Sequence, residues 1–202
     1  MNTKAHIMRE SLKLFLRKSF KEVTLNEILK KTNLSKGAFY YYYESKEQLF
    51  LEIVENYFSY TVIYNFDRYS KNSLKDFYED HLKDLEKAIG RFSSDKARMG
   101  SATAMNANYF YPMFDASRIL PEFMVKLREA RRQEVFYWSQ SVERARKSGE
   151  IVSRMSDEQI AKIFIYTGNS IGLQLIMEDG PVSSFVSSYR EFWDNFYESL
   201  KA

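Results

Sequence analysis

The sequence predicts an all-α protein. Of its 202 residues only 7 are Gly and 3 are Pro, whereas an all-β sandwich needs turn residues about every 8–12 positions. Apolar residues instead recur at the i, i+3, i+4 spacing of amphipathic helices along most of the chain. Residues that can cap a helix stand at the start of several of these stretches. We therefore expect about nine helices, with a small three-helix module preceding a larger helical bundle.

The first three predicted helices are closely spaced, and two of them are only about two turns long. Residues 5–20 form an amphipathic helix, and Thr24 begins a second one with a capping box. Asn33 tolerates the left-handed conformation that a tight helix exit requires. Ser35 then caps a third helix that runs to about residue 42. Because helices this short are unstable alone, they must pack against their neighbours.

The rest of the chain is predicted to form longer helices. Ser45 caps a fourth helix, which continues toward Tyr69. Further helices are expected at residues 74–89 with Gly90 as a stop, at 101–110 before a break at Tyr111-Pro112, at 121–147, at 156–177, and from the turn at 179–181 to about 200. We expect two domains, residues 1–46 and residues 47–202.

The composition excludes several classes of active site. The chain has no Cys, which removes disulfides, thiolate zinc sites and cysteine nucleophiles. His6 and His81 lie in separate predicted helices, and no nucleophile elbow, P-loop or dinucleotide motif occurs. We therefore expect neither an enzyme nor a protein with a metal or another cofactor. A polar N-terminus and the lack of a long apolar run predict a cytoplasmic protein without membrane contact.

Two of the short helices have the anatomy of a helix-turn-helix DNA-binding motif. A two-turn helix and a tight turn lead to a second helix that begins Ser35-Lys36-Gly37-Ala38. The small residues Gly37 and Ala38 let the backbone approach the floor of the major groove, and the Ala38 methyl group can meet a thymine methyl. Lys36 is placed to reach guanine acceptors or a phosphate.

Positive charge is concentrated in this part of the chain. Residues 1–46 hold ten basic and four acidic residues, a net charge of +6, whereas the remainder has a net charge of −3. This asymmetry indicates that a polyanion binds the first module. Tyr40 and Lys46 are the candidates for donating hydrogen bonds to phosphates, beside the free amides at the start of the helix that Ser45 caps.

The tyrosines at positions 40–43 point to different sides of the predicted helix, since successive residues are about 100° apart around the helix axis. Tyr43 shares a face with Phe39 and is expected in the core. The other three project from the remaining arc and are DNA-contact candidates: Tyr40, Tyr41 and Tyr42. The alternative is an ordinary amphipathic helix surface without DNA contact, in which Gly37 is only a weak point of the helix.

The residues around this motif resemble the TetR/AcrR family of transcription factors. The similarity runs from Phe20 to Ile28 and from Leu34 to Leu49. It implies a homodimeric, all-helical regulator, usually a repressor that a small effector releases from a pseudo-palindromic operator in double-stranded DNA. In the family, the DNA-contacting positions correspond to Thr24, Lys36, Gly37, Tyr40, Tyr42 and Lys46.

A few residues depart from the family pattern. Asn33 stands where the family often has Gly in the turn, a mild change because Asn also accepts a positive φ angle. Tyr41 and Tyr42 replace a common pair of His residues, and Tyr43 replaces the usual Phe. These changes can shift the base preference without disturbing the fold. Neither the motif nor the resemblance decides between a repressor and an activator.

The last two predicted helices are apolar on more than one side, which is typical of buried helices. They could be buried within one subunit, or they could pair with the same helices of a second copy. Since one helix-turn-helix reads only half a site, we expect a homodimer with a four-helix interface. Its candidate residues are Phe164, Gly168, Ile171, Gly172, Leu175, Phe185, Tyr189, Phe192 and Phe196.

Many aromatic and Met residues lie between residues 49 and 138. Such residues form a core more often than a pocket, but a pocket with this lining would take an apolar or aromatic effector. Its candidate residues are Tyr57, Tyr78, His81, Tyr109, Phe110 and Phe136. His81 lies on an apolar helix face, where it could equally be a hydrogen-bonded core residue.

A second hypothesis of another class stays open. The chain could be a helical protein-interaction module without sequence-specific DNA binding. That hypothesis predicts weak, sequence-independent DNA binding that is unaffected by substitutions at Lys36 or Tyr40.

Overall fold

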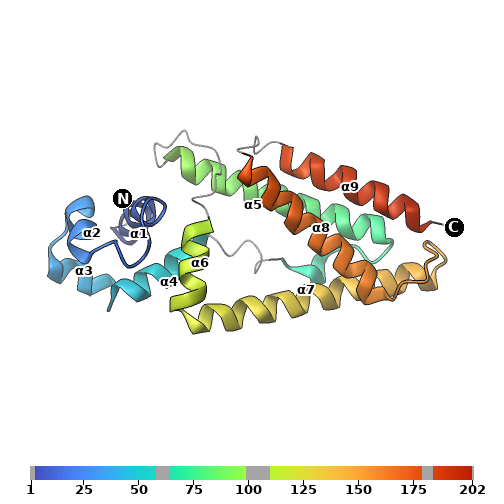
Figure 1. The fold of residues 1–202 in the computed structure, drawn as a ribbon, viewed down its shortest axis with the longest axis horizontal. Coiled ribbons are helices and arrows are strands. Elements are labelled where there is room, and N and C mark those ends of the chain that lie inside the picture. The colour runs from blue at the N-terminus through green and yellow to red at the C-terminus, as the bar shows by residue number, and fades with distance from the viewer. Residues whose placement is uncertain (1–2, 58–63, 99–109, 179–183, 202) are drawn as a thin grey trace. The chain divides into compact units, whose positions relative to one another are not determined.

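The structure is a computed structural model that describes residues 3–57, 64–98, 110–178 and 184–201, without the side chains of residues 57, 91–98 and 110. All regular elements in these ranges are helical, which confirms the predicted all-α class (Figure 1). The nine described α-helices are α1 (Thr3–Phe15), α2 (Leu25–Thr32), α3 (Lys36–Tyr42), α4 (Lys46–Tyr57), α5 (Leu74–Arg98), α6 (Phe110–Ile119), α7 (Pro121–Lys147), α8 (Asp157–Met177) and α9 (Ser184–Leu200), and η2 (Phe66–Arg68) is a short 3-10 helix.

The chain divides into two compact units. The described part of the first unit, which we call the head, comprises residues 3–57, 95–98 and 110–127. The described part of the second unit, the body, comprises residues 64–94, 128–178 and 184–201. The head therefore contains α4, α6 and the start of α7 in addition to the three short helices expected within residues 1–46.

Most of the helix ends lie where their capping residues predict. Thr24 and Ser156 each form a complete capping box at the start of α2 and α8. Asn33 ends α2 in the left-handed conformation, with a φ angle of 55°. Gly149, with a φ angle of 77°, follows the end of α7, where the left-handed region favours glycine. The chain therefore needs few Gly or Pro residues to separate its helices.

The first helix is shorter than predicted. The periodicity predicts a helix over residues 5–20, but α1 ends at Phe15 and the following residues form a turn. This turn lets the Phe20 ring pack against Phe50, with the ring centroids 4.7 Å apart. Phe15 lies at the same centroid distance from Phe50. Burial of the three rings together is the physical reason for the early end.

The predicted extension of the fourth helix to Tyr69 is wrong. α4 is described only to Tyr57, and Tyr64 and Asn65 are not helical. η2 follows and places Phe66 and Tyr69 in the body, where both side chains are buried. Contacts with α5 hold this segment, because the ring centroids of Phe66 and Tyr69 lie 6.2 Å and 5.3 Å from that of Phe77.

Gly90 does not end the fifth helix, contrary to the prediction. α5 continues to Arg98, and a Cβ atom at Gly90 would meet nothing within 4 Å. A single Gly costs a helix about 1 kcal/mol relative to Ala, which the good helix formers around it offset. The penalty alone is too small to stop a helix of 25 residues.

Pro112 does not break the chain as predicted, because it lies within α6. It is the third described residue of that helix. The rest of the helix predicted over residues 101–110 lies outside the described residues. Pro121 stands at the first position of α7, as expected.

The body is a bundle in which α5, α7, α8 and α9 share one core (Figure 1). Trp138 of α7 lies at its centre and is fully buried. Its ring centroid is 5.1 Å from that of Phe164 in α8 and 5.1 Å from that of Trp193 in α9. This aromatic cluster joins three helices that are distant in the sequence, and it stabilises the bundle mainly by apolar burial.

Two glycines allow α8 and α9 to approach closely. A Cβ atom at Gly168 would lie 2.8 Å from Tyr189 Cε1 and 3.0 Å from Trp193 Cζ2. A Cβ atom at Gly172 would lie 2.8 Å from the Tyr189 hydroxyl oxygen. The small-residue spacing in α8 therefore serves packing within one chain.

We expect Gly168→Ala to lower the free energy of unfolding by about 1–3 kcal/mol, because the new methyl group overlaps two buried rings. Gly90→Ala is the matched control, since it also replaces a helical Gly but adds a methyl group in open space. It is expected to raise the free energy of unfolding by about 0.5–1 kcal/mol. Urea denaturation measures both, and a stabilising Gly168→Ala would contradict the close packing.

Candidate nucleic-acid interface and body cavity

α2 and α3 form the predicted helix-turn-helix. The amide of Leu34 donates to the Leu29 carbonyl oxygen at 3.1 Å, which closes the turn after Asn33. Ser35 then accepts a hydrogen bond from the Ala38 amide at 3.1 Å and fixes the start of α3. Local capping thus sets the angle at which the second helix leaves the turn.

α3 has one buried and one exposed face, as the helical rotation predicts. Phe39 is 0% exposed and Tyr43 is 1% exposed, so both anchor the helix in the head core. Tyr40 is 47% exposed and Tyr41 is 82% exposed. Tyr42 is half-buried and packs edge-to-face against Tyr41, with the ring centroids 5.0 Å apart. The tyrosines are therefore presented on a helix that its own core holds in place.

The N-terminal end of α3 is an accessible surface. Lys36 is exposed, and its Nζ lies 6.0 Å from the centroid of the Tyr40 ring. Gly37 is exposed, and a Cβ atom there would meet nothing within 4 Å. Ala38 is half-buried beside them. Within the described part of the head, the Gly at position 37 therefore has no packing role.

The Thr24 side chain serves the capping box of α2. Its hydroxyl accepts from the Glu27 amide at 3.2 Å and donates to Glu27 Oε2 at 3.1 Å. The Lys18 ammonium, followed by the Thr24 donors, lowers the pKa of Glu27 to about 2. Glu27 is therefore ionised at neutral pH and keeps the box closed. The Thr24 side chain is exposed, but its hydroxyl group already caps α2, so any contact with a phosphate would compete with the capping hydrogen bonds.

Lys46 has an internal partner that the sequence did not indicate. Its Nζ donates to the carbonyl oxygens of Phe20 and Val23 at 2.8 Å and 2.6 Å, and it lies 4.1 Å from the centroid of the Phe20 ring. Burial lowers the pKa of this half-buried ammonium. Lys46 thus ties the start of α4 to the segment before α2, with one ammonium hydrogen left for a phosphate.

We expect Lys46→Met to lower the free energy of unfolding by about 1–2 kcal/mol, because two carbonyl oxygens lose a charged donor. Lys36→Met, on the exposed start of α3, is the control and should change it by less than about 0.5 kcal/mol. Urea denaturation of both variants checks this. Equal stabilities would show that the Lys46 contacts contribute nothing to the fold.

The cap of α4 differs from the predicted one in its second half. Ser45 Oγ accepts from the Gln48 amide at 3.0 Å, as expected. The Gln48 side chain, however, accepts from the amide of Glu44 at 2.6 Å. The Glu44 amide precedes the capping residue, so it is not one of the amides at the start of α4; among those, the Gln48 amide is the one that Ser45 uses.

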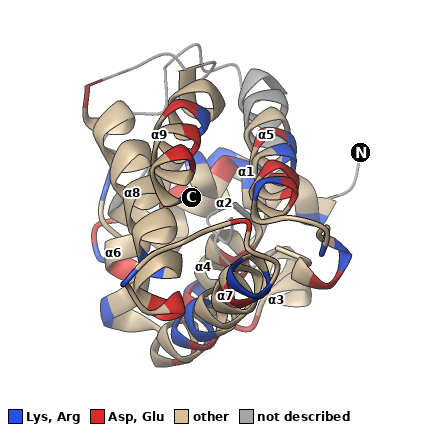
Figure 2. Cartoon of the chain, turned by 90° about the vertical axis from the view of Figure 1, so that its right-hand side faces the viewer, with Lys and Arg blue, Asp and Glu red and all other residues tan. Residues whose placement is uncertain are grey.

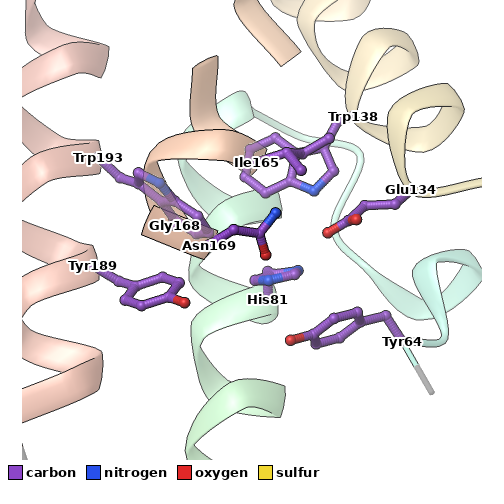
Figure 3. A pocket seen from close by; sticks show the side chains of 9 residues that line it. All are labelled: Tyr64, His81, Glu134, Trp138, Ile165, Gly168, Asn169, Tyr189 and Trp193. Atoms are coloured by element: carbon purple, nitrogen blue, oxygen red, sulfur yellow. The ribbon is translucent and has the colours of Figure 1, made fainter. Parts of the chain in front are cut away.

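A small cavity lies within the body (Figure 3). Its volume is about 30 Å³, which is enough to hold a water molecule. Described residues from α5, α7, α8 and α9 and the segment before η2 line it: Tyr64, His81, Glu134, Trp138, Ile165, Gly168, Asn169, Tyr189 and Trp193. It is the candidate effector site.

Only one predicted pocket residue reaches this cavity. His81 lines it, whereas Tyr78 is buried elsewhere and donates to Asp194 at 2.6 Å. Phe136 is 56% exposed and does not line it. The remaining predicted residues fall outside the description, Tyr109 entirely and Tyr57 and Phe110 in their side chains.

Two titratable groups in the cavity are strongly perturbed. His81 is 4% exposed, and burial lowers its pKa to about 3, so the ring is neutral. Glu134 is 6% exposed, and burial raises its pKa to about 7 against the opposing effect of its ion-pair partner Arg131. Burial also raises the pKa values of Tyr64 and Tyr189. The cavity is thus a poorly solvated place for a charge.

Sequence reasoning missed Glu134 and Trp138. The signal was present, since the two residues are four apart and share a face of α7. Arg131 precedes Glu134 by three positions and supplies its partner. A carboxylate on the same face as a core Trp is rare enough to mark a buried polar site.

The predicted interface residues fall into two groups. Five are buried within this chain and cannot face a second copy: Phe164, Gly168, Gly172, Phe185 and Tyr189. These five residues follow the first of the two alternatives given for the last helices, burial within one subunit. The other four are exposed or half-buried: Ile171, Leu175, Phe192 and Phe196. Across the described residues, no group of three or more His, Asp or Glu side chains could hold a metal ion.

Comparison with known proteins agrees with the geometry of the head. Residues 7–53 match the model of the family described as bacterial regulatory proteins, tetR family. The chain is 27% identical over 128 residues to IcaR of Staphylococcus epidermidis, the HTH-type negative transcriptional regulator of the biofilm operon icaADBC. That match covers 61% of this chain and 68% of the relative.

Another relative matches over a shorter region. The chain is 41% identical over 54 residues to the HTH-type transcriptional regulator QacR of Staphylococcus aureus. This match covers 27% of the chain and 29% of QacR.

Solved structures resemble the whole fold. A TetR transcription regulator from Haloarcula marismortui superposes with a TM-score of 0.66 at 12% identity, over 98% of each chain. A transcriptional regulator of the TetR/AcrR family superposes with a TM-score of 0.60 at 18% identity, over 96% of this chain and 99% of the other.

A capped helix, a closed turn and a second helix with an exposed N-terminal end define a DNA-binding transcriptional regulator of the helix-turn-helix class. The family match covers the same residues, so residues 7–53 form a DNA-binding module of the tetR family of bacterial regulatory proteins. The fold of the whole chain resembles those of TetR/AcrR transcriptional regulators.

Proposed function

We propose that the protein is a homodimeric repressor that binds a pseudo-palindromic operator and is released by a small apolar or aromatic effector. The exposed N-terminal end of α3 carries this proposal, because it places Lys36, Gly37 and Tyr41 on the open side of a helix anchored by Phe39. In this arrangement α3 enters the major groove. Lys36 and the tyrosines donate to bases and phosphates.

The proposed dimer interface is the outer face of α8 and α9. Tyr166, Leu173 and Met177 of α8 are 54%, 49% and 60% exposed, and Phe192 of α9 is 57% exposed. Between Ile163 and Met177 the sequence has no charged residue, and α8 appears almost entirely tan in Figure 2. An apolar face of this kind favours association with a second copy, which a half-site reader needs.

The proposed response to an effector depends on coupling between two sites. Effector binding in the body tilts α4 and changes the spacing of the two recognition helices. Thermodynamic linkage then requires that DNA weakens effector binding by the same factor by which effector weakens DNA binding. Unequal factors would exclude a simple two-state mechanism.

Within the head, Asp115 of α6 is placed to take part in this change. Its Oδ2 accepts from the amide of Phe20 at 2.6 Å, and the carbonyl of the same residue accepts from Lys46. The peptide groups on both sides of Phe20 are thus held by α6 and α4. A shift of either helix would move the segment that leads into α2.

The experiment for the proposed function selects bound fragments from the genome of the source organism and measures their affinity by fluorescence anisotropy. Sedimentation equilibrium gives the number of protein chains on each fragment. We expect two chains on a pseudo-palindrome and reduced transcription from the adjacent promoter in vitro. Binding without fragment preference would favour the protein-interaction module, and increased transcription would identify an activator.

A further inference from the structure

The polar groups of the body cavity converge on one small space. Figure 3 shows the hydroxyl groups of Tyr64 and Tyr189, the Asn169 amide, the Glu134 carboxylate and the His81 ring pointing toward it. They come from separate segments of the chain. Aromatic rings surround the same space, so a molecule that enters it meets ring faces and hydrogen-bonding atoms together.

Two of the lining side chains carry buried polar atoms without a partner. Among the described residues, neither Nδ1 of His81 nor Nε1 of Trp138 has a hydrogen-bond partner. Trp193 provides the contrast, because its Nε1–H donates to the Phe164 carbonyl oxygen at 3.0 Å. An unpaired buried donor or acceptor costs free energy, so these two atoms favour a bound molecule that pairs with them.

A hydroxyl group is the smallest group that can pair with both atoms. It accepts from the Trp138 N–H and donates to an unprotonated Nδ1 of His81. In the other His tautomer its oxygen accepts from both rings. A cavity of about 30 Å³ has room for such a group but not for an aromatic ring, so the ring displaces a lining side chain as it enters.

The electrostatics of the cavity restrict the charge of the molecule that binds there. Glu134 already has Arg131 as its ion-pair partner, and burial keeps His81 neutral. A cation or an anion from outside would therefore enter a buried site without a free counter-charge. An uncharged molecule avoids that cost.

We infer that the body cavity takes the hydroxyl group of an uncharged aromatic effector, with its ring packed against the aromatic side chains of the lining. The inference rests on the proposed role of the body as an effector-binding unit. It adds the chemical class of the effector and the atoms that select it, Trp138 Nε1–H and His81 Nδ1.

Four probes with the same ring system test this class: naphthalene, 2-naphthol, 2-naphthylmethylammonium and 2-naphthoate. Isothermal titration calorimetry on the full chain without DNA gives their dissociation constants. We expect 2-naphthol to bind about tenfold more tightly than naphthalene, and both charged probes to bind no better than naphthalene. Tightest binding of the ammonium probe would overturn the inference in favour of Glu134 as a counter-charge.

Binding of none of the probes would also overturn the inference and leave a buried water as the partner of the two atoms. The same preparation is assayed for fragment binding by anisotropy. If it binds its selected fragment but no probe, the inference fails while the proposed DNA-binding function stands. If it binds 2-naphthol but no fragment selectively, the proposed function fails and the effector class stands.

Trp138→Phe identifies the selecting atom, and Trp193→Phe is its matched control. The first removes the unpaired N–H, whereas the second removes one that already has a partner in the chain. We expect the preference of 2-naphthol over naphthalene to disappear in Trp138→Phe and to persist in Trp193→Phe. Persistence in both variants would contradict the assignment.

A measurement on the unaltered chain covers the case in which Trp138→Phe does not fold. The chain has 2 Trp residues, so its indole N–H signals in a proton–nitrogen correlation spectrum are two. Addition of 2-naphthol is expected to shift the Trp138 signal strongly and the Trp193 signal weakly. Equal shifts of both signals would contradict a specific contact at Trp138.

Discussion

Phe39→Ala is expected to lower the free energy of unfolding by about 3–5 kcal/mol and to abolish selective DNA binding. Phe39 is 0% exposed and is the apolar anchor of α3, a helix of only seven residues. Without that anchor the helix loses the packing that holds it at a fixed angle after Asn33. Urea denaturation and fluorescence anisotropy on the selected fragment measure the two effects.

Tyr41→Ala is the control for this prediction. Tyr41 lies two residues away on the same helix but is 82% exposed, so its removal should change stability by less than about 0.5 kcal/mol. It should still weaken binding to the selected fragment if it faces DNA. A Phe39→Ala variant as stable as Tyr41→Ala would contradict the assignment of the two faces of α3.

The second large effect is expected from Glu134→Gln and depends on pH. The ordinary pKa of this carboxyl is 4.5, and burial raises it to about 7 in the folded chain. Between these pH values the folded state binds more protons than the unfolded state, so the free energy of unfolding falls as the pH rises. Gln keeps the shape of the side chain and removes this dependence.

Between pH 4.5 and pH 7, the free energy of unfolding of Glu134→Gln should therefore rise by about 2–3 kcal/mol relative to that of the unaltered protein. His81 acts in the opposite direction, since its low pKa makes stability rise with pH from about 3 to 6.5. Because both proteins contain His81, their difference isolates Glu134. Urea denaturation at a series of pH values gives this difference, and a difference that does not change with pH would contradict the raised pKa of the buried carboxyl.

Local signals in the sequence predict most of the helices, because capping residues act on their immediate neighbours. Thr24, Asn33, Ser156 and Pro121 each fix a helix end within one turn. The early end of α1 is different, since it depends on the contact of Phe20 with Phe50, which is 30 positions away. Ends that tertiary contacts decide cannot be derived from periodicity alone.

The same distinction separates the DNA-facing surface from the cavity. Whether Phe39 or Tyr41 is buried follows from rotation about one short helix, and the sequence predicts it. The cavity instead depends on how α5, α7, α8 and α9 bring their side chains together, so the sequence predicts only His81 among the residues that line it. In α8, periodicity indicates that Gly168 lies on a buried face, but Tyr189 of the same chain covers that face.

In the proposed function, the N-terminal end of α3 reads the DNA sequence. Its most direct test is the salt dependence of DNA binding, measured by anisotropy on a selected and an unrelated fragment, for the unaltered chain, Lys36→Ala and Lys83→Ala. Lys83 is an exposed cation on α5 and serves as the control. We expect Lys36→Ala to lose discrimination between the fragments and, where Lys36 contacts a phosphate, to lower the salt slope by about 0.9. An unaltered chain without fragment preference, or a Lys36→Ala variant that behaves like Lys83→Ala, would contradict the claim.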